Sequence, residues 1–232
     1  MELKKPINEK EISEYKKREN LKKEEYIPKS FFLRPSEEVA PLLIGCRIQT
    51  KSPQGRKVIS TIVETEAYAP GDPACHAYIN KTRRNTPMFM DGGTLYIYKI
   101  YGIHLCLNIV TEKIEIPSAV LIRAVEIDEA NLLKLNLQPE MKRAGAGPGK
   151  LCKTLVITQE LNGKSIFGND EFSVLPRTRE LNQILKEGNS IIQTTRIGIS
   201  RGMEIPWRWY LRNSNSVSIR DRIAEKKLYD LG

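Results

Sequence analysis

The sequence has few of the residues that build metal centres and disulfide frameworks. It contains only two histidines, His76 and His104, and four cysteines, none of which stands in a C-x-x-C pair. Structural zinc sites need closely paired Cys and His ligands, and disulfide-rich domains need many closely spaced cysteines. The pattern therefore predicts neither a zinc site nor a disulfide framework, and it leaves no room for a His-rich metal centre.

Long apolar runs are also missing. No stretch approaches the ~18 uncharged apolar residues that a membrane-spanning helix needs. The first ten residues, M-E-L-K-K-P-I-N-E-K, contain no apolar core of a secretory signal. We therefore expect no membrane partner, and a cytoplasmic protein (or a nuclear one if the source is eukaryotic).

The sequence shows no internal repeat and no Gly/Ser-rich linker. Hydrophobic residues make up 40% and charged residues 28% of the 232 residues, which excludes a wholly disordered chain, a collagen-like repeat and a coiled-coil rod. The first 26 residues are rich in Lys and Glu and have little apolar periodicity, whereas apolar sequence begins at Tyr26-Ile27-Pro28. This change predicts a charged extension over 1–26 followed by one domain over 27–232.

The chain is strongly basic. Lys and Arg number 37 against 28 Asp and Glu, so the net charge is +9 and the isoelectric point is about 9.3. A domain of this charge is a candidate for binding a polyanion such as a nucleic acid. A basic enzyme with scattered surface lysines fits the charge equally well.

Strand signals are stronger than helix signals. Runs rich in β-branched and aromatic residues predict strands over 57–68, 93–101, 103–110 and 118–127. Weaker periodicity predicts helices over 36–45 and 128–136, with a third beginning near 150–152. Because strands and helices do not alternate regularly, we expect an α+β fold, in which a few helices pack on a mixed or antiparallel sheet.

The expected strand over 103–110 alternates cleanly. One face carries apolar residues (Ile103, Leu105, Leu107 and Ile109), and the other carries His104, Cys106 and Asn108. The preceding strand leads into it through Tyr101-Gly102. The two strands therefore predict a hairpin with Tyr101 near its tip.

The segment V-E-T-E-A-Y places Glu64, Glu66 and Tyr68 on one strand face. Acidic residues are depleted from strands, so this face is either exposed to solvent or contains a general base near the end of the strand. The loop that follows, 69–77, contains His76. A histidine in a loop is more often structural or simply exposed than functional.

A compact basic cluster, Lys81-Thr82-Arg83-Arg84-Asn85, precedes the expected hairpin, which carries Tyr96, Tyr98 and Tyr101. Cations beside stacking aromatics suit nucleic-acid contact, because they neutralise phosphates and offer faces for bases. Alternating tyrosines are also ordinary in sheet packing, so both interpretations remain open.

Two later segments also point to phosphate. The run A-G-A-G-P-G-K-L departs from the P-loop pattern at its first and last positions, but a Gly-rich turn before a helix, with Lys150 beside it, can hold a backbone phosphate. It can equally be a simple turn. Six arginines between 196 and 222 are candidates for phosphate contact or for structural ion pairs: Arg196, Arg201, Arg208, Arg212, Arg220 and Arg222.

Taken in order, these motifs resemble those of the alkyladenine (3-methyladenine) DNA glycosylases. The resemblance rests on V-E-T-E-A-Y, the loop ending in His76, R-N-x-x-M-F-M, G-T-L-Y-I-Y-K-I-Y-G, L-N-I, A-V-L-I-R-A-V-E, G-P-G-K-L and R-I-G, and it covers about residues 31 to 225. It implies a single domain around a curved antiparallel sheet with a protruding hairpin. It also implies a monofunctional enzyme without metal or cofactor that removes alkylated or deaminated purines from DNA.

The resemblance also implies roles for individual residues. Glu66 corresponds to the general base that activates water, Arg123 to the arginine that helps to hold this water, and Ile197 to the residue whose main-chain carbonyl contacts it. Four further residues correspond to the base-binding pocket: Tyr68, His76, Tyr98 and Asn108, the last on the pocket floor, where guanine is excluded.

For DNA contact, the resemblance assigns Tyr101 as the side chain that enters the duplex where the base has left. We also expect Thr82, Arg84 and Lys150 to contact the DNA. The implied partner is double-stranded DNA containing damaged purines, bound by a monomer.

Two other functions compete with this one. A nucleic-acid-binding module without catalysis explains the charge and the tyrosines, but not Glu66 beside Tyr68 and Arg123. A carbohydrate O-glycosidase would use Glu64 and Glu66 as its acid and base. However, residues i and i+2 on one strand lie on the same side of a substrate, whereas such enzymes place their carboxyls on opposite sides of the bond.

Overall fold

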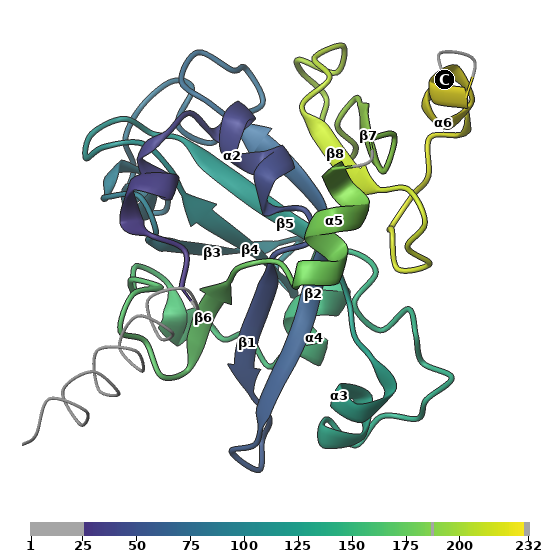
Figure 1. The fold of residues 1–232 in the computed structure, drawn as a ribbon. Helices are drawn as coiled ribbons and strands as arrows, with labels where there is room; N and C mark the ends of the chain where they lie inside the picture. Colours follow the sequence, from purple (N-terminus) through teal and green to yellow (C-terminus); the bar gives the residue numbers. More distant parts are fainter. Residues whose placement is uncertain (1–25, 187, 230–232) are drawn as a thin grey trace, which may run out of the picture.

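The computed structural model describes residues 26–186 and 188–229, so nearly all of the expected extension over 1–26 lies outside the described residues. The described chain is an α+β fold around a curled antiparallel sheet (Figure 1). This confirms the fold class expected from the sequence.

The sheet contains eight strands in the described residues. They are β1 (Arg47–Lys51), β2 (Lys57–Tyr68), β3 (Leu95–Ile100), β4 (His104–Val110), β5 (Ala119–Glu126), β6 (Phe172–Leu175), β7 (Ile191–Thr194) and β8 (Arg208–Leu211). Their order is β3-β4-β5-β2-β1-β6, with β8 paired to β2 and β7 paired to β8. The four strands expected from the sequence are therefore confirmed, with ends shifted by one or two residues at three of them.

Strand β2 organises the sheet because it pairs with three neighbours. It lies beside β5 along one edge, and along the other edge it pairs with β1 as far as Thr61 and with β8 from Glu64. The register against β5 shifts on both sides of Glu64. Such irregularities bend a strand and redirect its side chains, and here they coincide with the point where β2 leaves β1 for β8.

The helices are short. They are η1 (Lys29–Leu33), α2 (Ser36–Leu43), η2 (Thr86–Phe89), α3 (Glu129–Lys134), α4 (Pro148–Thr154), η3 (Gln159–Leu161), α5 (Arg179–Lys186) and α6 (Arg222–Tyr229). The three helices expected from the sequence are α2, α3 and α4, and the last begins at Pro148, slightly before the expected start. In the described part of the chain, none of these helices has the length and apolar character needed to cross a membrane.

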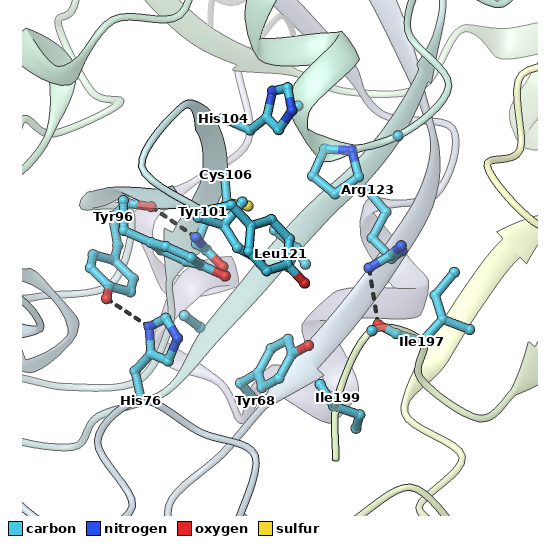
Figure 2. Close-up of a pocket in the computed structure, with 18 of the residues that line it drawn as sticks. Tyr68, His76, Tyr96, Tyr101, His104, Cys106, Leu121, Arg123, Ile197 and Ile199 are labelled. Carbon is cyan, nitrogen blue, oxygen red and sulfur yellow. Dashed lines mark hydrogen bonds between the residues drawn. The ribbon is translucent and has the colours of Figure 1, made fainter. Parts of the chain in front are cut away.

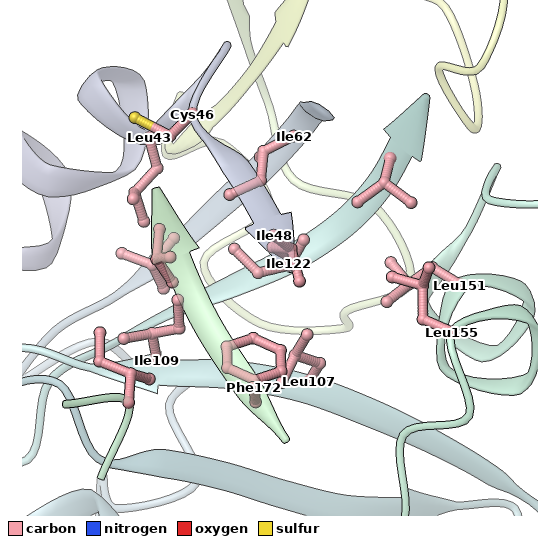
Figure 3. Close-up of a cluster of buried hydrophobic side chains, with 14 of the residues drawn as sticks. Leu43, Cys46, Ile48, Ile62, Leu107, Ile109, Ile122, Leu151, Leu155 and Phe172 are labelled. Carbon is pink, nitrogen blue, oxygen red and sulfur yellow. The ribbon is translucent and has the colours of Figure 1, made fainter. Parts of the chain in front are cut away.

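Helices α2 and α4 cover parts of the sheet and close the main core. In Figure 3, Leu43 of α2 and Leu151 of α4 join Ile62 and Ile122 from the central strands β2 and β5 and Phe172 from the edge strand β6. Burying apolar surface of this kind is the main favourable term in folding.

Strand β4 has the two faces expected from its alternation. Leu107 and Ile109 enter the main core, while Cys106 and Asn108 face a cavity on the other side. The expectation for Ile103 was wrong: its side chain is 75% exposed, because β4 begins only at His104 and Ile103 belongs to the turn.

Candidate active site

A cavity of about 700 Å³ opens between the hairpin β3–β4, the N-terminal end of α4 and residues 197–199 (Figure 2). Its lining includes every pocket residue expected from the sequence, namely Tyr68, His76, Tyr98, Asn108, Arg123 and Ile197. These residues come from four strands and two loops of the chain, so only the fold brings them together.

One wall is aromatic. The rings of His76 and Tyr98 meet edge to face at 4.5 Å, and those of Tyr96 and Tyr98 lie 5.2 Å apart. His76 Nδ1 and the Tyr96 hydroxyl are 2.9 Å apart, as Figure 2 shows. This fixes the orientation of the His76 ring toward the cavity.

His76 is neutral at neutral pH. Burial lowers the pKa of its imidazole, and the positive charge of Arg84 lowers it further. Arg84 reaches this wall because its guanidinium stacks on Tyr98 and donates to the Lys99 carbonyl at 2.8 Å. A neutral imidazole can donate from one nitrogen and accept at the other, which suits recognition of a heterocyclic base.

The floor is built from β4 and β5. The Asn108 side-chain amide donates to the Tyr96 carbonyl at 2.9 Å, so its direction is set by the neighbouring strand. Cys106 and Leu121 lie on the same floor. Burial raises the pKa of the Cys106 thiol, so it remains protonated and packs as a small apolar group.

Glu66 lies behind the cavity wall and is completely buried. Its carboxylate accepts hydrogen bonds from the Ile197 amide at 2.9 Å, from the Tyr68 hydroxyl at 2.8 Å and from Arg123 Nη1 at 3.2 Å. Burial raises the pKa of Glu66, and these three donors oppose that rise. A desolvated carboxylate of this kind is a stronger base than an exposed one.

Arg123 and Ile197 connect Glu66 to the cavity. Arg123 Nη1 also donates to the Ile197 carbonyl, at 3.4 Å (Figure 2). Both residues line the cavity, whereas Glu66 does not. A guanidinium, a main-chain carbonyl and a carboxylate thus converge at the closed end of the pocket.

The structure decides between the two interpretations of the strand face that carries Glu64 and Glu66. Both side chains are fully buried, so the exposed face is wrong. Glu64 is bound to Arg208, Ser218 and Arg123 and does not line the cavity. Glu64 is paired with Arg208 and Arg123 away from the cavity, so Glu64 and Glu66 cannot flank a glycosidic bond bound there, which argues against the O-glycosidase alternative.

Two of the four residues expected to touch DNA, Tyr101 and Lys150, line the cavity at its rim. Tyr101 is 84% exposed and has a φ of 52°, with Gly102 at 73°, so the tip is a turn with two left-handed residues. This conformation favours Asn or Gly over Tyr, so Tyr101 is placed there at a cost to folding. Lys150 lies on α4 at the same rim, and Lys153 lies one turn further on.

Thr82 lies in the loop before η2 and does not line the cavity. Its hydroxyl accepts from the Asn85 amide and its own amide donates to the Asn85 side chain, so the two residues hold the loop together. Thr82 and Arg84 are exposed. The loop that carries them continues directly from His76.

Of the six arginines between 196 and 222, at least three form structural ion pairs, as one interpretation allowed. Arg196 pairs with Asp72, Arg208 with Glu64, and Arg220 with Glu225. Arg196 was not expected at the site, but it stacks on Tyr68 and donates to the Ala67 carbonyl, so it supports the wall. Its position directly before Ile197 was the only signal in the sequence.

Among residues 26–186 and 188–229, no three His, Cys, Asp or Glu side chains lie close enough together to hold a metal ion. The four cysteines are buried free thiols.

Fold and cavity together define an α+β protein with an aromatic pocket beside a buried Glu–Arg ion pair. The family model of methylpurine-DNA glycosylase matches residues 30–215, and the chain belongs to this family.

Curated relatives agree along nearly their whole length. A protein of Trichodesmium erythraeum named "Putative 3-methyladenine DNA glycosylase" is 45% identical over 200 residues, which cover 84% of this chain and 98% of the relative. Proteins of the same name from Synechococcus elongatus and Methanocella arvoryzae are 42% and 41% identical, and the matches cover 83% and 84% of this chain and 90% and 96% of theirs.

Proposed function

We propose that this protein is a DNA glycosylase that removes alkylated and deaminated purines, such as 3-methyladenine and hypoxanthine, from double-stranded DNA. The reaction hydrolyses the N-glycosidic bond and leaves an abasic site. The observation that carries the proposal is the convergence of Glu66, Arg123 and the Ile197 carbonyl at the closed end of an aromatic pocket. The family membership and the names of the relatives support a DNA glycosylase that acts on alkylated bases.

The substrate base must leave the helical stack to reach this pocket. Extrusion costs a few kcal/mol. Stacking on aromatic side chains returns about 1–3 kcal/mol per base, and here Tyr68, His76 and Tyr98 offer the faces. Tyr101 projects from the rim, where it can fill the space that the base leaves and keep the duplex open.

Hydrolysis needs a water molecule beside the sugar carbon. In our proposal, this water is held by the Ile197 carbonyl and Arg123, and Glu66 accepts its proton. As the bond to the base breaks, positive charge develops on the sugar, and the negative charge of Glu66 stabilises it. Because Tyr68 occupies one oxygen of Glu66 in this structure, the water has to use the other or displace the phenol.

Base selection would come from the wall and the floor. Neutral His76 can exchange hydrogen bonds with the edge of a purine. The Asn108 side chain is held in place by its hydrogen bond to the Tyr96 carbonyl. The exocyclic amine of guanine would therefore meet a side chain that cannot move away. A cationic 3-methyladenine leaves readily, whereas neutral hypoxanthine needs hydrogen-bond assistance.

Affinity for DNA would come from the basic rim. Arg84, Lys150 and Thr82 are proposed to contact phosphates. We propose that the protein acts as a monomer on chromosomal DNA in the cytoplasm (in the nucleus if the source is eukaryotic).

The test is incubation with a duplex carrying one hypoxanthine, and separately with methylated DNA, followed by alkaline cleavage of abasic sites. We expect cleavage at the lesion only, and none in an undamaged duplex. Binding without cleavage would instead support a module that only binds nucleic acid.

Two controls address the reaction type. Activity should survive a chelator, and borohydride should trap no protein–DNA adduct. The second control matters because Lys150 and Lys153 line the cavity. A trapped adduct that disappears in Lys150→Met or Lys153→Met would contradict simple hydrolysis.

A further inference from the structure

Four buried charged side chains alternate in sign from the interior to the pocket. They are Arg208, Glu64, Arg123 and Glu66, and none is more than 9% exposed. Arg208 Nη1 donates to Glu64 at 2.8 Å, Arg123 Nε lies 3.3 Å from Glu64, and Arg123 Nη1 lies 3.2 Å from Glu66. The proposed mechanism uses only the last two members of this row.

Glu64 is rigidly held. Besides Arg208, it accepts hydrogen bonds from the Ser218 amide at 2.7 Å and from the Ser218 hydroxyl at 2.9 Å. Arg208 is itself fixed by the carbonyls of Thr195 and Ile219, both at 2.8 Å. The carboxylate of Glu64 therefore has a position set by the C-terminal segment and not by the pocket.

Arg123 is held far less tightly. Its Nε has no hydrogen-bond partner despite the nearby Glu64, and its Nη1 bonds are long, at 3.2 Å to Glu66 and 3.4 Å to the Ile197 carbonyl. A guanidinium normally makes short, paired bonds with a carboxylate. Here the guanidinium lies between two carboxylates and makes a short, paired hydrogen bond with neither.

We propose that Glu64 is a positioning residue that keeps Arg123 from closing on Glu66 and leaves Nη1 shared between Glu66 and the Ile197 carbonyl. Glu64 does not line the cavity, so it acts through Arg123 and not on the substrate. This inference rests on the proposed function, because it concerns the group that holds and activates the water.

The consequence for Glu66 has a definite sign. Its pKa is raised by burial and, to a lesser extent, by the negative charge of Glu64. Without that charge, Arg123 would turn entirely to Glu66 and the pKa of Glu66 would fall. The other groups that influence this carboxylate would be unchanged: the Ile197 amide, Tyr68, Tyr98, Cys106 and Arg196.

The experiment measures single-turnover excision of hypoxanthine against pH for the unchanged protein and for Glu64→Gln. Glutamine has nearly the same shape and can still accept from Ser218. We expect the acid limb of the profile to shift to lower pH by roughly one unit, which is the size of the pKa shift that one nearby charge causes. The plateau rate should fall by about tenfold to a hundredfold, because small misplacements near the chemistry are costly.

A matched control is Glu225→Gln. The same substitution then breaks an ion pair with Arg220 that does not touch Arg123. Its acid limb should coincide with that of the unchanged protein. A shift of equal size in this control would show that the effect of Glu64→Gln is general and would overturn the inference.

Glu64→Gln leaves Arg208 without a buried countercharge and can fail to fold. The double variant Glu64→Gln/Arg208→Met removes both charges and must move the acid limb in the same direction, by a smaller amount. If a folded variant keeps the original acid limb, the inference is wrong. If the unchanged protein excises nothing, the proposed function is wrong instead, so the two failures are distinct.

Discussion

The two ends of the cavity depart in opposite ways from the usual burial of side chains. At the closed end, Glu66 and Arg123 are charged and buried. At the open end, Tyr101 and Ile103 are large and apolar, and they are 84% and 75% exposed. Buried charges and exposed aromatics both cost folding free energy, so each end has a reason other than stability.

The ends differ in how they are held. Glu66 is fixed by hydrogen bonds from Tyr68 of β2, Arg123 of β5 and Ile197 in the segment after β7. At the hairpin tip, by contrast, two residues have positive φ, and no atom of the described residues lies within 4 Å of a Cβ placed on Gly102. A change at the closed end should therefore affect stability and chemistry together. A change at the tip should affect DNA opening alone, which makes the two ends separable by experiment.

The largest effect is expected at the closed end. Glu66→Gln should lower excision by more than about 10²-fold, the lower end of what a general base contributes, and the additional loss of its negative charge should remove detectable turnover. Binding of lesion DNA should stay within a few-fold, because the aromatic wall is untouched. Single-turnover excision and equilibrium binding on the same duplex measure the two quantities.

The free energy of unfolding should also change in Glu66→Gln, since Arg123 loses one of its two carboxylates. Substantial residual turnover would contradict the assignment of Glu66. An unchanged rate with strongly weakened binding would place this residue in substrate recognition.

A smaller and more selective effect is expected at the tip. Tyr101→Ser should leave the free energy of unfolding within about 0.5 kcal/mol, as for exposed positions generally, and it should weaken flipping. Excision of hypoxanthine paired with thymine should therefore slow by more than excision of the same base in an unpaired bulge.

Ile103→Ser is the matched control, because this side chain belongs to the same turn and is exposed to a similar extent. A smaller loss in Ile103→Ser would assign the wedge to Tyr101 specifically. If Tyr101→Ser unfolds the protein, or slows both substrates equally, Tyr101 is a packing or pocket residue and the comparison between the two ends fails.

Sequence reasoning predicted the strands better than the site. The alternation in β4 correctly separated Leu107 and Ile109 from Cys106 and Asn108, because period 2 is a local property. The ends of elements were less accurate. Ile103 was expected on the apolar face of the strand, but the turn between β3 and β4 takes three residues, 101–103, and periodicity does not show where a turn ends.

For the site, local pattern placed Glu66 and Tyr68 together, but it could not decide between an exposed face and a buried one. That decision depends on β5 and β8 packing beside β2, which are contacts between residues more than 50 positions apart. For the pair of Arg196 and Asp72, 124 residues apart, the only signal in the sequence was the position of Arg196 directly before Ile197. The residues proposed to carry the chemistry were predicted through the resemblance, whereas Arg196 and Asp72, which support them, were found at the site only in the fold.

The smallest effect is expected from removing the Tyr68 hydroxyl at the closed end. Tyr68→Phe keeps the ring that faces the cavity and stacks on Arg196, but it removes the hydroxyl that donates to Glu66 at 2.8 Å. That bond stabilises the ionised carboxylate, so its loss should raise the pKa of Glu66 further.

A base with a higher pKa is protonated at a higher pH. The acid limb of the excision profile in Tyr68→Phe should therefore shift to higher pH, opposite to the shift expected for Glu64→Gln. The plateau rate should change by only a few-fold, because the base is stronger and the oxygen vacated by the phenol becomes accessible to water. Tyr98→Phe is the control, since it removes a hydroxyl from the same pocket without a hydrogen bond to Glu66. An acid limb that moves down in Tyr68→Phe, or equally in both variants, would show that Glu66 does not govern the pH dependence.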